Sequence, residues 1–119
     1  MSWLSAPNTP IRDWAARTVW VLGASAGIGL SLAQALERRG ARVCVSARRI
    51  EALELAFPSD EVLKLSCDIA QPEAVTLALA QQAARGRMPD VIFWVAGDYQ
   101  PMSVLHFDPS RARSLIELN

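Results

Sequence analysis

Three glycines lie where an apolar stretch passes into a helical one. The stretch from Val21 to Leu36 reads VLGASAGIGLSLAQAL, and Gly23, Gly27 and Gly29 have the spacing G-x-x-x-G-x-G. Glycine lets the backbone turn tightly and approach a ligand, while a helix N-terminus offers free N–H groups and a positive dipole end. This combination suits a phosphate group. Close packing of the helix on a strand is the alternative for Gly27 and Gly29, and the glycines alone support it equally.

The elements that must position these glycines alternate between two periodicities. Short apolar runs predict buried strands, and apolar residues at helical spacing predict amphipathic helices. The expected strands are 18–23, 42–47, 62–68 and 90–97, and the expected helices are 28–39, 50–57, 72–85 and one that opens at Asp108. The order βαβαβαβα predicts an α/β fold, with a parallel sheet and helices on both faces. Its first strand-to-helix turn is where such folds hold the pyrophosphate of a dinucleotide.

The glycine motif in this setting resembles that of the short-chain dehydrogenase/reductase family, which typically reads T-G-x-x-x-G-I-G. Here LGASAGIG, from Leu22 to Gly29, lacks only the leading threonine. The resemblance covers roughly residues 18–119 and implies a Rossmann-type, doubly wound parallel sheet, truncated here after the fourth strand and the helix that follows it. Besides the glycines, the motif's candidate cofactor contacts are Ser25, Ala26 and Ile28.

Two further strand ends carry the resemblance. The family usually has an Asp after the third strand that contacts the adenine ring, and SCDIA supplies Asp68 followed by Ile69. Capping of a turn is the alternative role for this Asp. The fourth strand of the family usually ends N-N-A-G, whereas this chain has WVAG. Both asparagines are missing, but Ala96 and Gly97 would still let the cofactor's ribose sit close.

The end of the second expected strand favours NADP over NAD. Relatives that prefer NAD usually have an acidic residue there, and this chain has Ala47 followed by Arg48 and Arg49. Without the carboxylate nothing repels a 2′-phosphate, and a guanidinium can hold one with two charge-assisted hydrogen bonds. Arg48 is the first candidate and Arg49 the second; the alternative is a solvated pair.

Of the family's catalytic residues, this sequence supplies one. Asn119 falls at the position of the helix Asn that helps hold a proton-relay water, whereas the Ser, Tyr and Lys of relatives lie beyond the end of this chain. Tyr99 has no Lys four residues on, and Lys64 is the only lysine. The resemblance thus implies the cofactor-binding half of an NADP-dependent oxidoreductase that interconverts a carbonyl and an alcohol, inactive by itself. The alternative is a non-catalytic nucleotide-binding module or a truncation product.

Composition bears on partners and location. The formal net charge is zero and basic residues do not cluster, which argues against nucleic acid. No apolar run approaches the roughly 20 residues that span a bilayer. Cys44 and Cys67 lie in apolar stretches, as reduced core residues of a cytoplasmic protein do, and no metal-ligand spacing occurs. His106, the sole histidine, is expected in a loop.

The chain is expected to form one incomplete domain, residues 18–119, behind a leader of residues 1–17. Pro7 and Pro10 break any helix in the leader, so we expect it to be loosely held, although Trp3 and Trp14 offer a way to dock it. The fourth strand is left as an apolar edge, which invites pairing with another chain. A homo-oligomer is therefore a candidate assembly.

Overall fold

The computed structural model describes residues 10–96 and residue 110. Strands and helices alternate along this part of the chain, as the sequence predicts. The elements are the 3-10 helix η1 (Trp14–Ala16), β1 (Thr18–Leu22), α1 (Gly27–Arg38), β2 (Arg42–Ala47), α2 (Ile50–Ala56), β3 (Leu63–Ser66), α3 (Pro72–Ala84) and β4 (Val91–Trp94).

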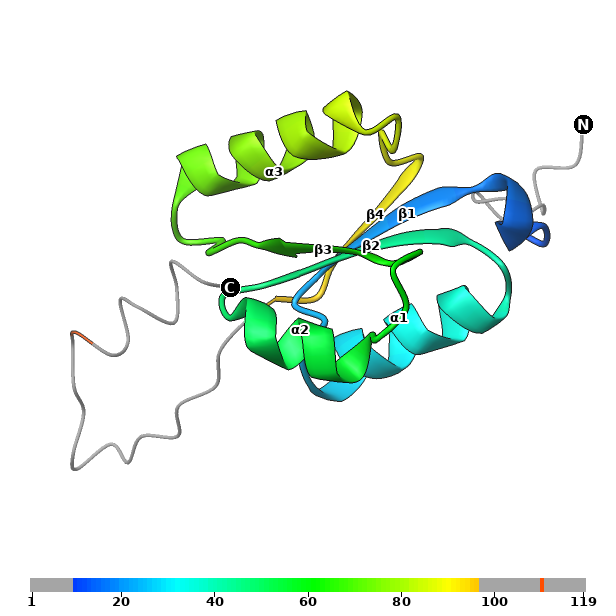
Figure 1. The fold of residues 1–119 in the computed structure, drawn as a ribbon, viewed down its shortest axis with the longest axis horizontal. Coiled ribbons are helices and arrows are strands. Elements are labelled where there is room, and N and C mark those ends of the chain that lie inside the picture. The colour runs from blue at the N-terminus through cyan, green and yellow to red at the C-terminus, as the bar shows by residue number, and fades with distance from the viewer. Residues whose placement is uncertain (1–9, 97–109, 111–119) are drawn as a thin grey trace, which may run out of the picture.

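The four strands form one parallel sheet in the order β3-β2-β1-β4. β1 lies between β2 and β4, and Val21 pairs in register with Val45 on one side and with Phe93 on the other. Every residue of β1 is buried, which explains why this strand is apolar almost throughout. The expected Rossmann-type parallel sheet is confirmed for these four strands (Figure 1).

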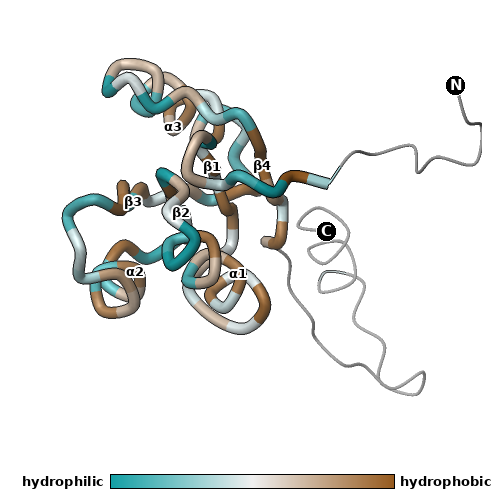
Figure 2. Tube along the Cα trace, turned by 90° about the vertical axis from the view of Figure 1, so that its right-hand side faces the viewer, coloured by the Kyte–Doolittle hydropathy of each residue, from teal (hydrophilic) through white to brown (hydrophobic). Residues whose placement is uncertain are grey.

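Helices cover both faces of the sheet, with α1 and α2 on one face and α3 on the other (Figure 2). Side chains of β1 alternate between the two layers: Val19 and Val21 join the core beneath α1 and α2, and Trp20 and Leu22 join the core beneath α3. The buried Trp20 indole Nε1 donates a hydrogen bond of 2.7 Å to Ser46 Oγ, so its polar atom is satisfied. This bond ties the central strand to β2 at the level of the glycine turn.

β3 and β4 are shorter than the sequence predicts, although backbone bonding continues past both. Beyond β3, Cys67 N donates to Ala47 O at 2.8 Å, and beyond β4, Val95 N donates to Leu22 O at 3.0 Å. β4 is also less buried than its apolar run suggests, because it is an edge strand and α3 packs over the other three. Ile92 and Trp94 on that face are 51% and 54% exposed.

The described end of the leader is docked on the sheet. Trp14 packs against the core on the α1 side, and its ring centroid lies 6.4 Å from that of Phe93. Trp14 is therefore docked as the sequence allowed, and the loosely held leader stays a prediction. The remaining expectations concern residues outside the described part of the chain. They are Trp3, Pro7, Gly97, Tyr99, His106, the helix from Asp108 and Asn119.

Candidate functional site

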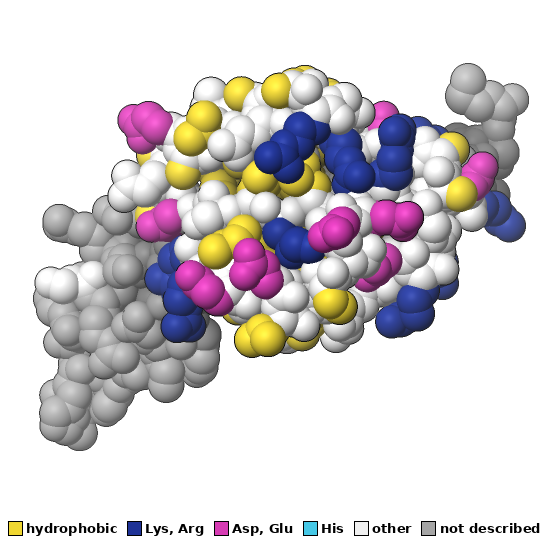
Figure 3. All heavy atoms as spheres, in the orientation of Figure 1, with side chains coloured by type: hydrophobic (Ala, Val, Ile, Leu, Met, Phe, Trp, Pro, Cys, Tyr) yellow, Lys and Arg dark blue, Asp and Glu magenta, His cyan; other side chains and the backbone are white. Residues whose placement is uncertain are grey.

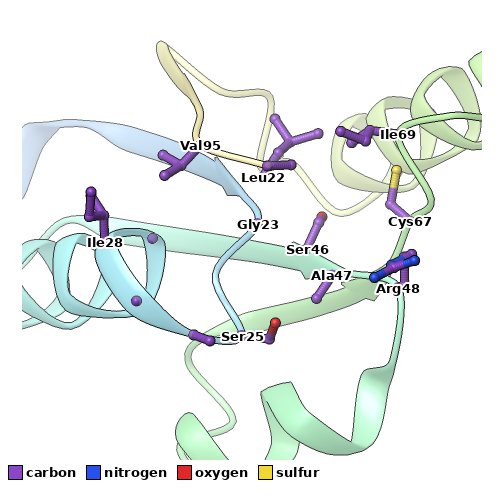
Figure 4. A pocket seen from close by; sticks show the side chains of 14 residues that line it. Leu22, Gly23, Ser25, Ile28, Ser46, Ala47, Arg48, Cys67, Ile69 and Val95 are labelled. Carbon is purple, nitrogen blue, oxygen red and sulfur yellow. The ribbon is translucent and has the colours of Figure 1, made fainter. Parts of the chain in front are cut away.

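A pocket of about 590 Å³ opens at the carboxyl ends of the strands, where each of the four strands is followed by a loop. This is the crevice in which open α/β sheets bind ligands. Figure 4 shows Arg48 and Cys67 on one side of it and Ile28 and Val95 on the other, with Gly23 and Ser25 between them. The lining residues are Leu22, Gly23, Ser25, Ala26, Gly27, Ile28, Gly29, Ser46, Ala47, Arg48, Cys67, Ile69, Val95 and Ala96.

Two of the three motif glycines are required by packing. A Cβ on Gly29 would overlap the carbonyl oxygen of Gly23, so α1 could not begin so close to the end of β1. Gly23 itself has a φ of +90°, and a Cβ there would come within 2.6 Å of the backbone of Ala96. These two glycines let β1, α1 and the segment after β4 meet at the base of the pocket.

Gly27 is different, because packing does not explain it. An added Cβ would have no neighbour within 4 Å, and the residue lines the pocket. Its φ of +60° lies in the left-handed region that glycine adopts without penalty. Gly27 therefore lets the chain turn into α1 while leaving the space in front of the helix end empty of side chain.

The N-terminus of α1 faces this space with unused hydrogen-bond donors. Its N-cap residue, Ala26, makes no side-chain cap, and the first turn contains no acidic residue. Gly23 N and Ala24 N donate to Ser46 O at 2.8 and 3.1 Å, so the loop before the helix is fixed to β2. The N–H groups of the first helical turn have no intrahelical acceptor, which makes this end of α1 suited to an anion.

On the β2 side, Arg48 is the one positively charged side chain among the lining residues. It is exposed at the pocket rim, while Ala47 before it is buried. Ser66 Oγ donates to Arg48 O at 2.9 Å, which holds the backbone and leaves the guanidinium available. Arg49 is also exposed, but it is the N-cap residue of α2 and does not line the pocket.

Past β3, the pocket wall is formed by Cys67 and Ile69, which also belong to the core beneath α3. Asp68, between them, does not line the pocket. Its Oδ1 accepts a hydrogen bond of 3.0 Å from Ala70 N, as an Asp that stabilises a turn does. Its contact with an adenine ring stays a prediction.

Sequence reasoning missed several lining residues, namely Leu22, Ser46, Cys67 and Val95. All belong to strands or their immediate ends, so their apolar setting indicated only burial. Burial raises the pKa of the Cys67 thiol, and the negative charge of Asp68 acts in the same direction. Cys67 is therefore a neutral wall of the pocket near pH 7. Cys44, the other free thiol, is buried beneath α3.

Two other kinds of site find no support in the described ranges. Within residues 10–96, His, Cys, Asp and Glu side chains do not gather in a group of three that could hold a metal ion. No helix in the described part of the chain is both long and apolar enough to cross a bilayer.

Comparison with known proteins agrees with the geometry. The family model for short chain dehydrogenases matches residues 17–119. A 3-ketodihydrosphingosine reductase of Neurospora crassa is 34% identical over 72% of this chain and 27% of its own length. The human dehydrogenase/reductase SDR family member 7 is 33% identical over 85% of this chain and 32% of its own length. The chain thus spans about a third of the length of these curated relatives.

Solved structures share the fold. A putative gluconate dehydrogenase from Agrobacterium tumefaciens superposes with a TM-score of 0.82 over 90% of this chain and 44% of its own, at 20% identity. A short-chain dehydrogenase from Streptomyces avermitilis superposes with a TM-score of 0.75 over 87% of this chain and 38% of its own, at 34% identity. The chain belongs to the short-chain dehydrogenase/reductase family, whose members are oxidoreductases that bind a nicotinamide dinucleotide.

Proposed function

We propose that this chain binds NADP and forms the cofactor-binding part of an oxidoreductase that interconverts a carbonyl and an alcohol. The observation that carries the proposal is the uncapped N-terminus of α1, which faces the pocket across Gly27. A pyrophosphate needs hydrogen-bond donors and room, and this helix end offers both. When bound, the nicotinamide ring would supply or accept the hydride.

The residues present fit a dinucleotide. Donors of the first turn of α1 would hold the pyrophosphate, with Ser25 beside them on the pocket wall. Ala47 and Arg48 would face the adenosine ribose, and Ile69 would offer an apolar surface to the adenine ring. Gly97 and Asn119 keep the roles predicted from the resemblance: the close approach of a ribose and the placement of a proton-relay water. Arg49 remains the second candidate, after Arg48, for the contact with a 2′-phosphate.

The choice of NADP rests on charge. The pocket has no carboxylate at Ala47, where one would repel a 2′-phosphate. Arg48 brings a guanidinium to the same rim, and its side chain makes no ion pair with any described residue. A planar guanidinium donates two parallel hydrogen bonds to a phosphate, so Arg48 favours the phosphorylated cofactor.

Gly27→Ala tests the proposal. The new Cβ would lie in the space that the phosphates need, so we expect NADPH to bind at least about tenfold more weakly by calorimetry, a loss of about 1.4 kcal/mol. The substitution also carries a backbone penalty, because alanine at positive φ costs roughly 1–2 kcal/mol. A control must reproduce that penalty away from the pocket.

Gly86→Ala is the matched control. Gly86 has a φ of +67°, an added Cβ would have no neighbour within 4 Å, and the residue follows α3, away from the pocket. Both variants should lose similar stability in urea denaturation, but only Gly27→Ala should lose NADPH. Equal NADPH affinity in the two variants would contradict a phosphate site at α1.

We also propose a cytoplasmic location, because both cysteines are free and buried rather than paired. Labelling of the intact protein in cell extracts with a thiol reagent, before and after denaturation, would test it. The expected result is two reactive thiols that become accessible only on unfolding. Oxidised thiols in freshly prepared extract would contradict the proposal.

A further inference from the structure

A second groove, of about 440 Å³, lies where β3 begins and α3 ends. The strands are parallel, so this is the amino end of the sheet, opposite the dinucleotide pocket. Its charged lining residues are Lys64, Arg85, Arg87 and Asp60, and Val62 and Leu63 form its apolar part. Three positive charges face one negative charge. Figure 3 shows Lys and Arg side chains gathered beside and below the C-terminal end of α3.

Two of these cations are held in place by backbone carbonyls. Lys64 Nζ donates to Phe57 O at 2.8 Å and to Ser59 O at 2.9 Å, and Arg87 Nη1 donates to Glu61 O at 2.6 Å. Carbonyl oxygens fix the side chains without neutralising their charge. The groove therefore keeps its positive charge in a defined arrangement, at little further cost in side-chain entropy when a ligand binds.

Donors remain available for that ligand. The side chain of Arg85 makes no hydrogen bond or ion pair with the described residues, so all five of its guanidinium N–H groups are unused. Arg87 has used one nitrogen, and the ammonium of Lys64 keeps one of its three donors. Two planar guanidinium forks and an ammonium group match the oxygens of a phosphate.

The guanidinium groups also act on the buried sheet. Burial raises the pKa of the Cys44 thiol to about 12, and Arg87 and Arg85 both act in the opposite direction. Cys44 lies within β2, in the core beneath α3. Both positive charges therefore lie close enough to β2 to act on a thiol in its core, although Arg85 is exposed and Arg87 is half-buried.

We propose that this groove is a second anion site, which binds a phosphate group through Arg85, Arg87 and Lys64. Asp60 is also among the lining residues, but three cations outweigh its carboxylate, so the charged lining still attracts a phosphate. The ligand is inorganic phosphate or a small phosphate monoester.

NMR titration of the folded chain tests the proposal, with NADPH present at saturation so that the first pocket is filled. The probes are inorganic phosphate and glycerol 3-phosphate, added at constant ionic strength against chloride. We expect saturable shifts of the backbone amides of residues 59–64 and 85–88. Tighter binding of glycerol 3-phosphate would identify a monoester as the ligand, tighter binding of inorganic phosphate would identify the free ion, and equal binding would show recognition of the phosphate group alone.

Arg85→Gln is the decisive variant, since the Arg85 side chain makes no described contact and the backbone bond from Arg85 N to Gln82 O is kept, so the fold should stay intact. Losing one charge-assisted pair should weaken phosphate binding about tenfold or more. Arg39→Gln is the matched control, because Arg39 is the C-cap of α1 as Arg85 is the C-cap of α3, and each precedes a glycine of positive φ.

The Arg39→Gln control also distinguishes a specific phosphate site from a general interaction of arginines with the negative ends of helices. If the two arginines only complement the negative ends of their helices, phosphate should shift both helix ends alike and Arg85→Gln should change nothing. That result, or shifts that rise linearly without saturation, would overturn the proposal. A further loss of affinity in Arg85→Gln/Arg87→Gln, with an unchanged circular dichroism spectrum, would support it.

Discussion

The two ends of the sheet offer anions two different kinds of site. At the carboxyl end, the donors are backbone N–H groups of α1, and the local sequence from Gly23 to Gly29 creates them. At the amino end, the donors are the side chains of Lys64, Arg85 and Arg87, which come from two segments, β3 and the turn after α3. The first site depends on the absence of side chains, and the second depends on their presence.

This difference determines how each site can be damaged. Apart from proline, no substitution of one residue removes a backbone donor, so the carboxyl-end site is weakened by adding atoms, as at a glycine. The amino-end site is weakened by deleting atoms. The two should also differ in salt dependence, since exposed charges are screened by salt while a helix end buried under its ligand is screened less.

The largest effect is expected for Gly29→Ala, which tests the packing side of the comparison. The new Cβ would overlap Gly23 O and approach Gly23 C at 2.8 Å, both of them backbone atoms that cannot move without shifting β1 or α1. We expect a loss of about 3 kcal/mol or more in the free energy of unfolding, at the upper end for overpacking. Urea denaturation measures it, with Gly27→Ala as the milder reference. Equal stability of the two variants would show that α1 can move away from β1.

The next largest effect is expected for Arg48→Ala, because Arg48 is the one charged side chain among the residues that line the carboxyl-end pocket. A hydrogen bond to a charged group contributes roughly 1.5–3 kcal/mol, so NADPH should bind about tenfold to a hundredfold more weakly. NADH, which lacks the 2′-phosphate, should keep its affinity. Calorimetry at two salt concentrations measures both, because the contact is ionic.

Arg49→Ala is the control for that experiment, since Arg49 is equally exposed but does not line the pocket. It should leave both cofactors unaffected. Equal losses of NADPH and NADH in Arg48→Ala would give Arg48 a structural role instead. A loss confined to Arg49→Ala would move the phosphate contact to that residue.

The same contrast between local and assembled features explains which parts of the fold and of the site could be predicted from the sequence. The parallel sheet, the helices on both faces and the place of the glycine turn followed from apolar periodicity, because each element is encoded by neighbouring residues. The motif itself did not distinguish the roles of its glycines. Gly29 is fixed by the carbonyl of Gly23 and Gly23 by Ala96, contacts that exist only once the strands are assembled.

Residues contributed by distant segments could not be predicted in this way. Cys67 and Ser46 looked like ordinary core positions, and only the end of the sheet brings them to the pocket. The sequence predicted β4 as an apolar edge, but not the exposure of its face on the α3 side, because an apolar run does not tell how far α3 reaches across the sheet. The basic groove could not be predicted from the sequence, since Lys64 and Arg87 are 23 positions apart and only the fold brings them together.

The smallest effect is expected for Gln82→Met, which tests a buried polar side chain at the amino end of the sheet. Gln82 is fully buried in the last turn of α3, and its Nε2 donates to Ala78 O at 3.3 Å. Its Oε1 has no hydrogen-bond partner among the described residues. An unsatisfied buried acceptor costs about 1–3 kcal/mol, and methionine has a similar shape and helix propensity without the polar oxygen.

We therefore expect Gln82→Met to raise the free energy of unfolding by about 1 kcal/mol, after the weak bond to Ala78 O is lost. The neighbouring Gln81 is exposed, so Gln81→Met should be neutral and serves as the control. Phosphate binding in the groove should not change, because the turn after α3 is held by the backbone oxygen of Gln82, which accepts from Arg87 N at 2.8 Å and is kept in the variant. A loss of stability would instead mean that Oε1 is satisfied by an ordered water, which would make the amino end of the sheet a hydrated polar site and strengthen its contrast with the glycine turn.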